Sequence, residues 1–155
     1  MILDHTLEDF RARFARITAE HGEPLDAILA ILDDCFDLTE QEIQRNRLLV
    51  AEVGRLSGHR SSPREEQARQ ASRARMRDLE FAWASFLAQA MQRGVLPQQD
   101  PRMLTRAVLG LYNSIWQWYR PDGIVALAEV RDFYIGRALA VMGIEHEAER
   151  PRIAA

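Results

Sequence analysis

Apolar residues recur at alternating steps of three and four along most of this chain, and this spacing confines the chain to helices. The stripe around residues 4–21 consists of Leu3, Leu7, Phe10, Phe14 and Ile17. Gly22 ends it, and Pro24 suits the first turn of a second helix because the N–H that proline lacks would have no helical partner there. No alternation of apolar and polar residues indicates a strand. The sequence therefore predicts an all-α chain.

Capping residues divide the remainder of the chain into four further helices. Thr39 with Glu42, and Ser62 with Glu65, have the spacing of reciprocal capping boxes, which predicts helices that begin near these residues and end near residues 57 and 94. Asp100 before Pro101 opens a fifth helix, which runs to about residue 119, and a sixth runs from about residue 124 to Gly143. The predicted fold is a six-helix bundle.

The length and the single cysteine limit the class of protein. We expect one helical domain over residues 1–143 and a polar, frayed tail over residues 144–155. Cys35 has no second cysteine to pair with, which favours a reducing compartment. No signal peptide and no run of about 20 apolar residues is visible, so we predict a cytoplasmic protein that does not enter the membrane.

The charge of the chain does not favour direct binding of nucleic acid. The 20 basic residues, all of them arginine, stand against 23 acidic ones and give a formal charge of −3. A free-standing nucleic-acid binder needs the opposite field. The complete absence of lysine indicates GC-rich coding and favours a bacterial source.

The last two predicted helices carry apolar residues on more than one face, so each needs cover on two sides. A second copy of the chain provides this cover economically, because the two helices of each copy can form a four-helix interface in a homodimer. The alternative is that one of the two helices is the central core helix of a monomer. The predicted interface residues are Leu104, Val108, Leu111, Ile115, Leu127, Tyr134 and Leu139.

Asn113 and Gln117 interrupt the most apolar helix, four residues apart and therefore on one face. Burying them unpaired would be costly, so they are expected to bond either an effector or a neighbouring helix. Helical bundles bind ligands between helices, which favours the effector. The predicted ligand site consists of Phe14, Phe36, Met76, Trp83, Phe86, Asn113, Trp116 and Gln117. Each aromatic residue of this set also suits a plain core position.

Catalysis and metal binding find little support in the sequence. The four histidines, His5, His21, His59 and His146, lack the spacing of a metal pair, and Cys35 lies in an apolar stripe. Asp33, Asp34 and Asp37 form either a cation site or, as we prefer, a solvated helix end. The arginines from Arg64 to Arg77 either face a phosphate-bearing effector or lie on a solvated face. We predict no catalytic residue, no metal and no cofactor.

Three motifs resemble the C-terminal domain of TetR-family transcriptional regulators. They are Gly94-Val95-Leu96 after a long helix, Asp100-Pro101 before an apolar one, and the run from Trp116 to Gly123 before a helix that contains Arg137-Ala138-Leu139 and ends at Gly143. The subgroup that this pattern resembles most responds to CoA thioesters. The resemblance implies a homodimer that binds a hydrophobic effector, with an acyl-CoA or related thioester as one candidate.

The same resemblance implies that DNA is bound only through a helix-turn-helix head, which is absent from this chain because the chain begins at about the connecting helix. The alternative function is a headless dimerisation module that binds no ligand.

Overall fold

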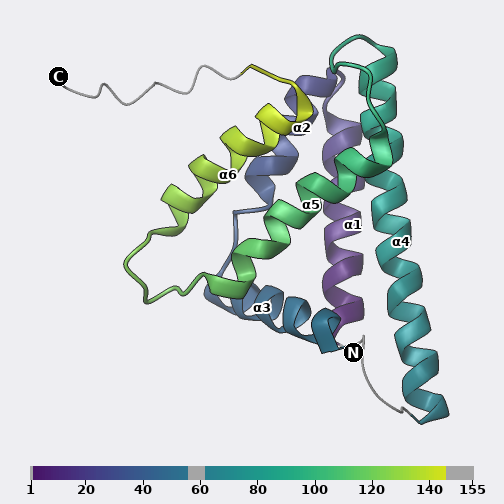
Figure 1. Cartoon of the computed structure of the whole chain (residues 1–155), viewed down its shortest axis with the longest axis vertical. Coiled ribbons are helices and arrows are strands. Elements are labelled where there is room, and N and C mark those ends of the chain that lie inside the picture. Colours follow the sequence, from purple (N-terminus) through teal and green to yellow (C-terminus); the bar gives the residue numbers. More distant parts are fainter. Residues whose placement is uncertain (1, 56–61, 146–155) are drawn as a thin grey trace.

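The computed structural model describes residues 2–55 and 62–145, and in these residues it contains six α-helices and no strand (Figure 1). This confirms the predicted all-α fold. The helices are α1 (Ile2–Glu20), α2 (Pro24–Asp34), α3 (Glu40–Arg55), α4 (Pro63–Gln92), α5 (Pro101–Trp118) and α6 (Leu127–Met142).

The helix starts follow from local side-chain hydrogen bonds. At α3 the Glu42 N–H donates to Thr39 Oγ1 at 3.3 Å and the Thr39 N–H donates to Glu42 Oε2 at 2.8 Å. Ser62 and Glu65 form the same reciprocal box at α4. Asp100 accepts the N–H groups of Arg102 and Met103 at 2.8 and 3.0 Å, which satisfies two donors that the first turn of α5 leaves free.

Two helix ends differ from the expectation or lie outside the described residues. The last helix begins at Leu127 and not near Ile124, because Gly123 closes a turn onto the carbonyl of Arg120 and Ala126 takes the N-cap position. The predicted end of α3 near residue 57 falls within residues 56–61, outside the described part. Gly94 and Gly143 end α4 and α6 with φ of 74° and 83°, a left-handed conformation that favours glycine.

Helix α5 lies at the centre of the bundle and contacts α3, α4 and α6, while α1 packs against α2, α3 and α4 (Figure 1). The interior beside α5 is aromatic: Phe36, in the turn after α2, packs against Tyr112, Trp116 and Tyr134 with ring centroids 5.2–6.3 Å apart. The inner face of α5 is therefore covered by its own chain.

Several residues of the predicted dimer interface are buried within one copy. Leu104, Val108 and Leu139 are at most 3% exposed and belong to the core of the single chain. Ile115 and Tyr134 are also buried, although both border an outer groove between α5 and α6. Leu111 is exposed at that groove and Leu127 is half-buried.

Among the described helices, none has the length and apolar character needed to cross a bilayer.

Candidate ligand-binding cavity

A largely apolar cavity of about 310 Å³ lies between α1, α3, α4 and α5. This volume is at the lower end of the range for small-molecule sites, which suits a compact ligand. Its apolar wall consists of Leu7, Phe10, Leu49, Val50, Met76, Leu79, Leu109, Tyr112 and Trp116. Its polar wall consists of Thr6, Asn46, Glu80, Asn113 and Gln117.

Helix periodicity explains why α5 contributes most to this wall. Residues 109, 112, 113, 116 and 117 follow one another at steps of three, one, three and one, so they occupy a single face of α5. Two carboxamides therefore share a face with Leu109 and Trp116. Polar and apolar side chains of α5 are therefore combined on the face that borders this cavity.

The structure brings together four of the eight residues predicted for the ligand site. Met76, Asn113, Trp116 and Gln117 line the cavity. Phe14 and Phe86 border a separate cavity of about 370 Å³ between α1 and the C-terminal half of α4.

The other two predicted residues belong to the packed core. Phe36 is enclosed by the aromatic residues of α5 and α6, and Trp83 packs on Phe14 with ring centroids 5.1 Å apart. Both are at most 6% exposed. Sequence reasoning missed the contribution of α1 and α3, namely Thr6, Leu7, Phe10, Asn46, Leu49 and Val50. Leu7 and Phe10 belong to the first apolar stripe, and Leu49 and Val50 to an apolar run in α3, but such patterns do not distinguish a cavity wall from a packed core.

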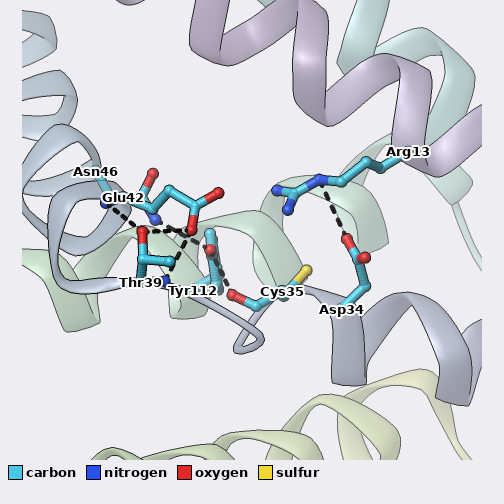
Figure 2. Close-up of polar contacts among 7 residues, drawn as sticks. All are labelled: Arg13, Asp34, Cys35, Thr39, Glu42, Asn46 and Tyr112. Carbon is cyan, nitrogen blue, oxygen red and sulfur yellow. Dashed lines mark hydrogen bonds and ion pairs between the residues drawn. The ribbon is translucent and has the colours of Figure 1, made fainter.

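Tyr112 connects three helices beside the cavity (Figure 2). Its hydroxyl donates to the carbonyl of Cys35 at 2.9 Å, and Asn46 Nδ2 donates to the same hydroxyl at 3.4 Å. Burial raises the pKa of the Tyr112 hydroxyl well above its ordinary value, so this group remains a protonated donor. The hydroxyl thereby holds the end of α2 and the middle of α3 against α5.

Arg13 occupies the neighbouring polar region. Its Nε forms an ion pair with Asp34 at 3.4 Å, and the terminal amino groups point toward the side where Glu42 and Tyr112 lie (Figure 2). A polar cavity of about 260 Å³ is lined by Arg13, Arg45 and two carboxylates, those of Asp9 and Glu42. It shares Thr6, Phe10 and Asn46 with the apolar cavity, so the two adjoin.

The acidic cluster at the end of α2 is explained by ion pairs. Arg131 Nη2 lies 2.6 Å from Asp33 Oδ1, and Asp34 pairs with Arg13. Within the described residues, no three histidine, cysteine or acidic side chains are grouped closely enough to hold a metal ion. His59 and His146, two of the four scattered histidines, lie outside the described residues.

The Cys35 thiol should make stability fall at alkaline pH. Burial, and secondarily Asp34, raises its pKa from 9.0 to about 12. Because the folded pKa is the higher one, the contribution of this thiol is fully present below about pH 9 and is lost as pH rises toward 12. The unfolding free energy should therefore fall by up to about 1.4 kcal/mol per pH unit through this group.

Urea titrations of wild type and Cys35→Ala between pH 8 and pH 10.5 measure this effect. The advantage of wild type over the variant should shrink across this range, with other titrating groups common to both proteins. A constant difference would show that the thiol titrates normally in the folded chain.

Comparison with known proteins agrees with the fold. The family model described as "Tetracyclin repressor-like, C-terminal domain" matches residues 22–142. A solved TetR/AcrR-family transcriptional regulator from Thermobifida fusca is 23% identical, with a TM-score of 0.68 over 93% of this chain and 71% of that chain. At this identity the likeness shows the fold alone. No curated protein matches the chain.

Two structures of AibR are also similar. AibR in complex with isovaleryl coenzyme A and operator DNA is 19% identical, with a TM-score of 0.59 over 88% of this chain and 70% of that chain. Apo AibR is 20% identical, with a TM-score of 0.56 over 88% and 69%.

Proposed function

The chain belongs to the family of tetracyclin repressor-like C-terminal domains, and from this premise we propose that it binds an apolar small-molecule effector inside its bundle. The observation that carries the proposal is the cavity of about 310 Å³, whose wall combines nine apolar or aromatic residues with two side-chain amides on one face of α5. Ligand sites in proteins typically have this composition. The role is binding and regulation, without catalysis.

The effector would act through α1. This helix contributes Thr6, Leu7 and Phe10 to the cavity wall, and an ion pair from its Arg13 holds the end of α2. A ligand that contacts this wall favours whichever position of α1 gives it the better contacts. We place DNA binding in a helix-turn-helix unit outside this domain, because the formal charge of −3 does not favour phosphate. Such a regulator would work in the bacterial cytoplasm.

An acyl-CoA or related thioester is one candidate for the effector. Support comes from AibR, a protein of the same fold that was solved with isovaleryl coenzyme A. In this chain the apolar cavity would hold the acyl part.

We also propose that the domain is a homodimer. The outer groove between α5 and α6 has a volume of about 440 Å³, and Leu111, Trp118, Val125 and Phe133 at this groove are 37–67% exposed. A two-fold axis would place the same apolar groove of a second copy against it. This groove is also the observation that favours the rival function, a dimerisation module without a ligand.

Filling the cavity separates the two functions. Val50→Trp places a large side chain in the wall, whereas Leu48→Trp adds the same group on α3 at a residue that is 54% exposed and outside the cavity. We expect Nile red and a panel of acyl compounds and steroids to bind wild type and Leu48→Trp, and to bind Val50→Trp at least about tenfold more weakly.

Thermal shift provides the second readout. A ligand at a hundredfold excess over Kd should stabilise the folded state by about 2.7 kcal/mol, or about 5–10 °C in Tm. If no compound shifts Tm or displaces Nile red while the protein remains a dimer, the dimerisation module is the correct function.

A further inference from the structure

The charge of the cavity wall is one-sided. Among the described residues that line it, Glu80 of α4 is the only one with a charged side chain, and it is an anion. Glu80 is 38% exposed, and its ion-pair partner Arg106, at 3.8 Å, is 74% exposed and does not line the cavity. A carboxylate or phosphate that entered would lose part of its water and meet the Glu80 carboxylate, with no cation in the cavity wall to offset the repulsion.

Hydrogen-bonding capacity in the wall is concentrated in Asn113 and Gln117. Within the part of the chain that the structure describes, neither carboxamide forms a hydrogen bond with the protein. The other amide of the wall, Asn46, donates to the Tyr112 hydroxyl, and this hydroxyl donates to the Cys35 carbonyl. Each carboxamide offers a donor and an acceptor. They lie one turn apart on the face of α5 that also carries Leu109 and Trp116.

The adjoining polar cavity does not supply an anion site either. Its two guanidinium groups are accompanied by two carboxylates, and Arg13 is already paired with Asp34. The charges there balance within the protein. An anionic head group that reached from the apolar cavity would meet the carboxylates of Asp9 and Glu42 as well as the two arginines.

Building on the proposed effector binding, we propose that the cavity selects an uncharged, mostly apolar molecule that carries an amide, ester, ketone or hydroxyl group. Asn113 and Gln117 bind this group, and Glu80 disfavours carboxylates and phosphates. This selection argues against the CoA thioester considered above, although Arg13 and Arg45 line the adjoining polar cavity, and the ligands compared below decide between the two.

A matched pair of ligands tests the selection. Octanamide and octanoate have the same chain and differ in charge at pH 7.5, and both can be titrated against bound Nile red. Wild type should bind octanamide at least about tenfold more tightly than octanoate or octanoyl-CoA. Equal or tighter binding of octanoate or of octanoyl-CoA overturns the proposal.

Variants of α4 identify the residue responsible. Glu80→Gln should raise octanoate affinity about tenfold and change octanamide affinity less than about twofold. Asp78→Asn removes the same charge from an exposed residue of α4 outside the cavity and should change neither. If Asp78→Asn acts like Glu80→Gln, the effect is one of net charge and Glu80 is no filter.

The double variant Asn113→Leu with Gln117→Leu tests the polar contacts. Its octanamide affinity should fall at least about fivefold, while toluene, which has no polar group, binds as well or better. Unchanged octanamide affinity would remove these residues from the site. The proposed function is tested separately by Nile red, which should bind wild type and not Val50→Trp. If Nile red binds both proteins equally or neither, the proposed effector cavity fails, whatever the octanamide and octanoate affinities are.

Discussion

Replacing Trp83 by alanine should lower the free energy of unfolding by about 3–5 kcal/mol. Trp83 is 1% exposed and packs on Phe14, so its indole holds the middle of α4 against α1. Truncation removes the largest buried side chain of α4 and leaves a cavity that the neighbouring helices can only partly close. At about 2–4 °C per kcal/mol for a domain of this size, Tm should fall by about 10 °C.

Phe81→Ala is the matched control, because it truncates an aromatic side chain of the same helix that is 70% exposed. It should change the unfolding free energy by no more than about 0.5 kcal/mol. Urea unfolding should be measured for both variants at the same protein concentration, because the apparent stability of a dimer depends on concentration. If Trp83→Ala does not fold, Trp83→Phe keeps a ring against Phe14 and should show an intermediate loss. Equal losses at positions 81 and 83 would contradict this packing of α4.

The helices were predictable because their ends depend on short-range chemistry. Thr39 and Glu42, or Ser62 and Glu65, are three residues apart, and their mutual hydrogen bonds form within one turn whatever the rest of the chain does. The start of α6 was harder, since Ala126 caps it without a side-chain hydrogen bond and Ile124 continues the apolar pattern into the turn.

The division of α5 into buried and exposed faces depended on information that the sequence lacks. Val108 and Leu111 are equally apolar in the sequence, yet Val108 is fully buried within one copy and Leu111 is 37% exposed. A helix that is apolar all round needs cover, but its composition cannot tell whether the cover comes from its own chain or from a partner.

The wall of the candidate cavity was predictable where polarity stood out against its surroundings. Asn113 and Gln117 stood out as amides on an apolar helix, and the structure places both at the cavity as exposed residues. Phe36 and Trp83 could not be separated from ligand-wall residues, because an aromatic residue at helical spacing serves either role. Asn46 reaches the site only through the packing of α3 against α5, a long-range contact between residues 46 and 112.

Phe133→Glu should convert the proposed dimer into a monomer. Phe133 is 67% exposed at the groove between α5 and α6, so a second copy seated there would bury it. In a two-fold interface each substitution occurs twice, and each time a carboxylate would lose its water against the apolar residues of the groove, at a cost of several kcal/mol that one neighbouring cation only partly offsets. Dimer affinity should fall by at least about a thousandfold, equivalent to about 4 kcal/mol.

The isolated fold should tolerate this variant. Arg137 lies one turn further along α6, with its guanidinium 5.0 Å from the Phe133 ring, so a glutamate at position 133 gains a cation four residues away. Circular dichroism should remain helical while light scattering after size exclusion falls to the mass of one chain, 17.8 kDa. Leu48→Glu places the same charge on exposed α3 and should remain dimeric. A Phe133→Glu protein that remains dimeric would place the interface on another surface. A wild-type protein that is already monomeric would contradict the dimer proposal itself, because the groove would then be exposed to solvent.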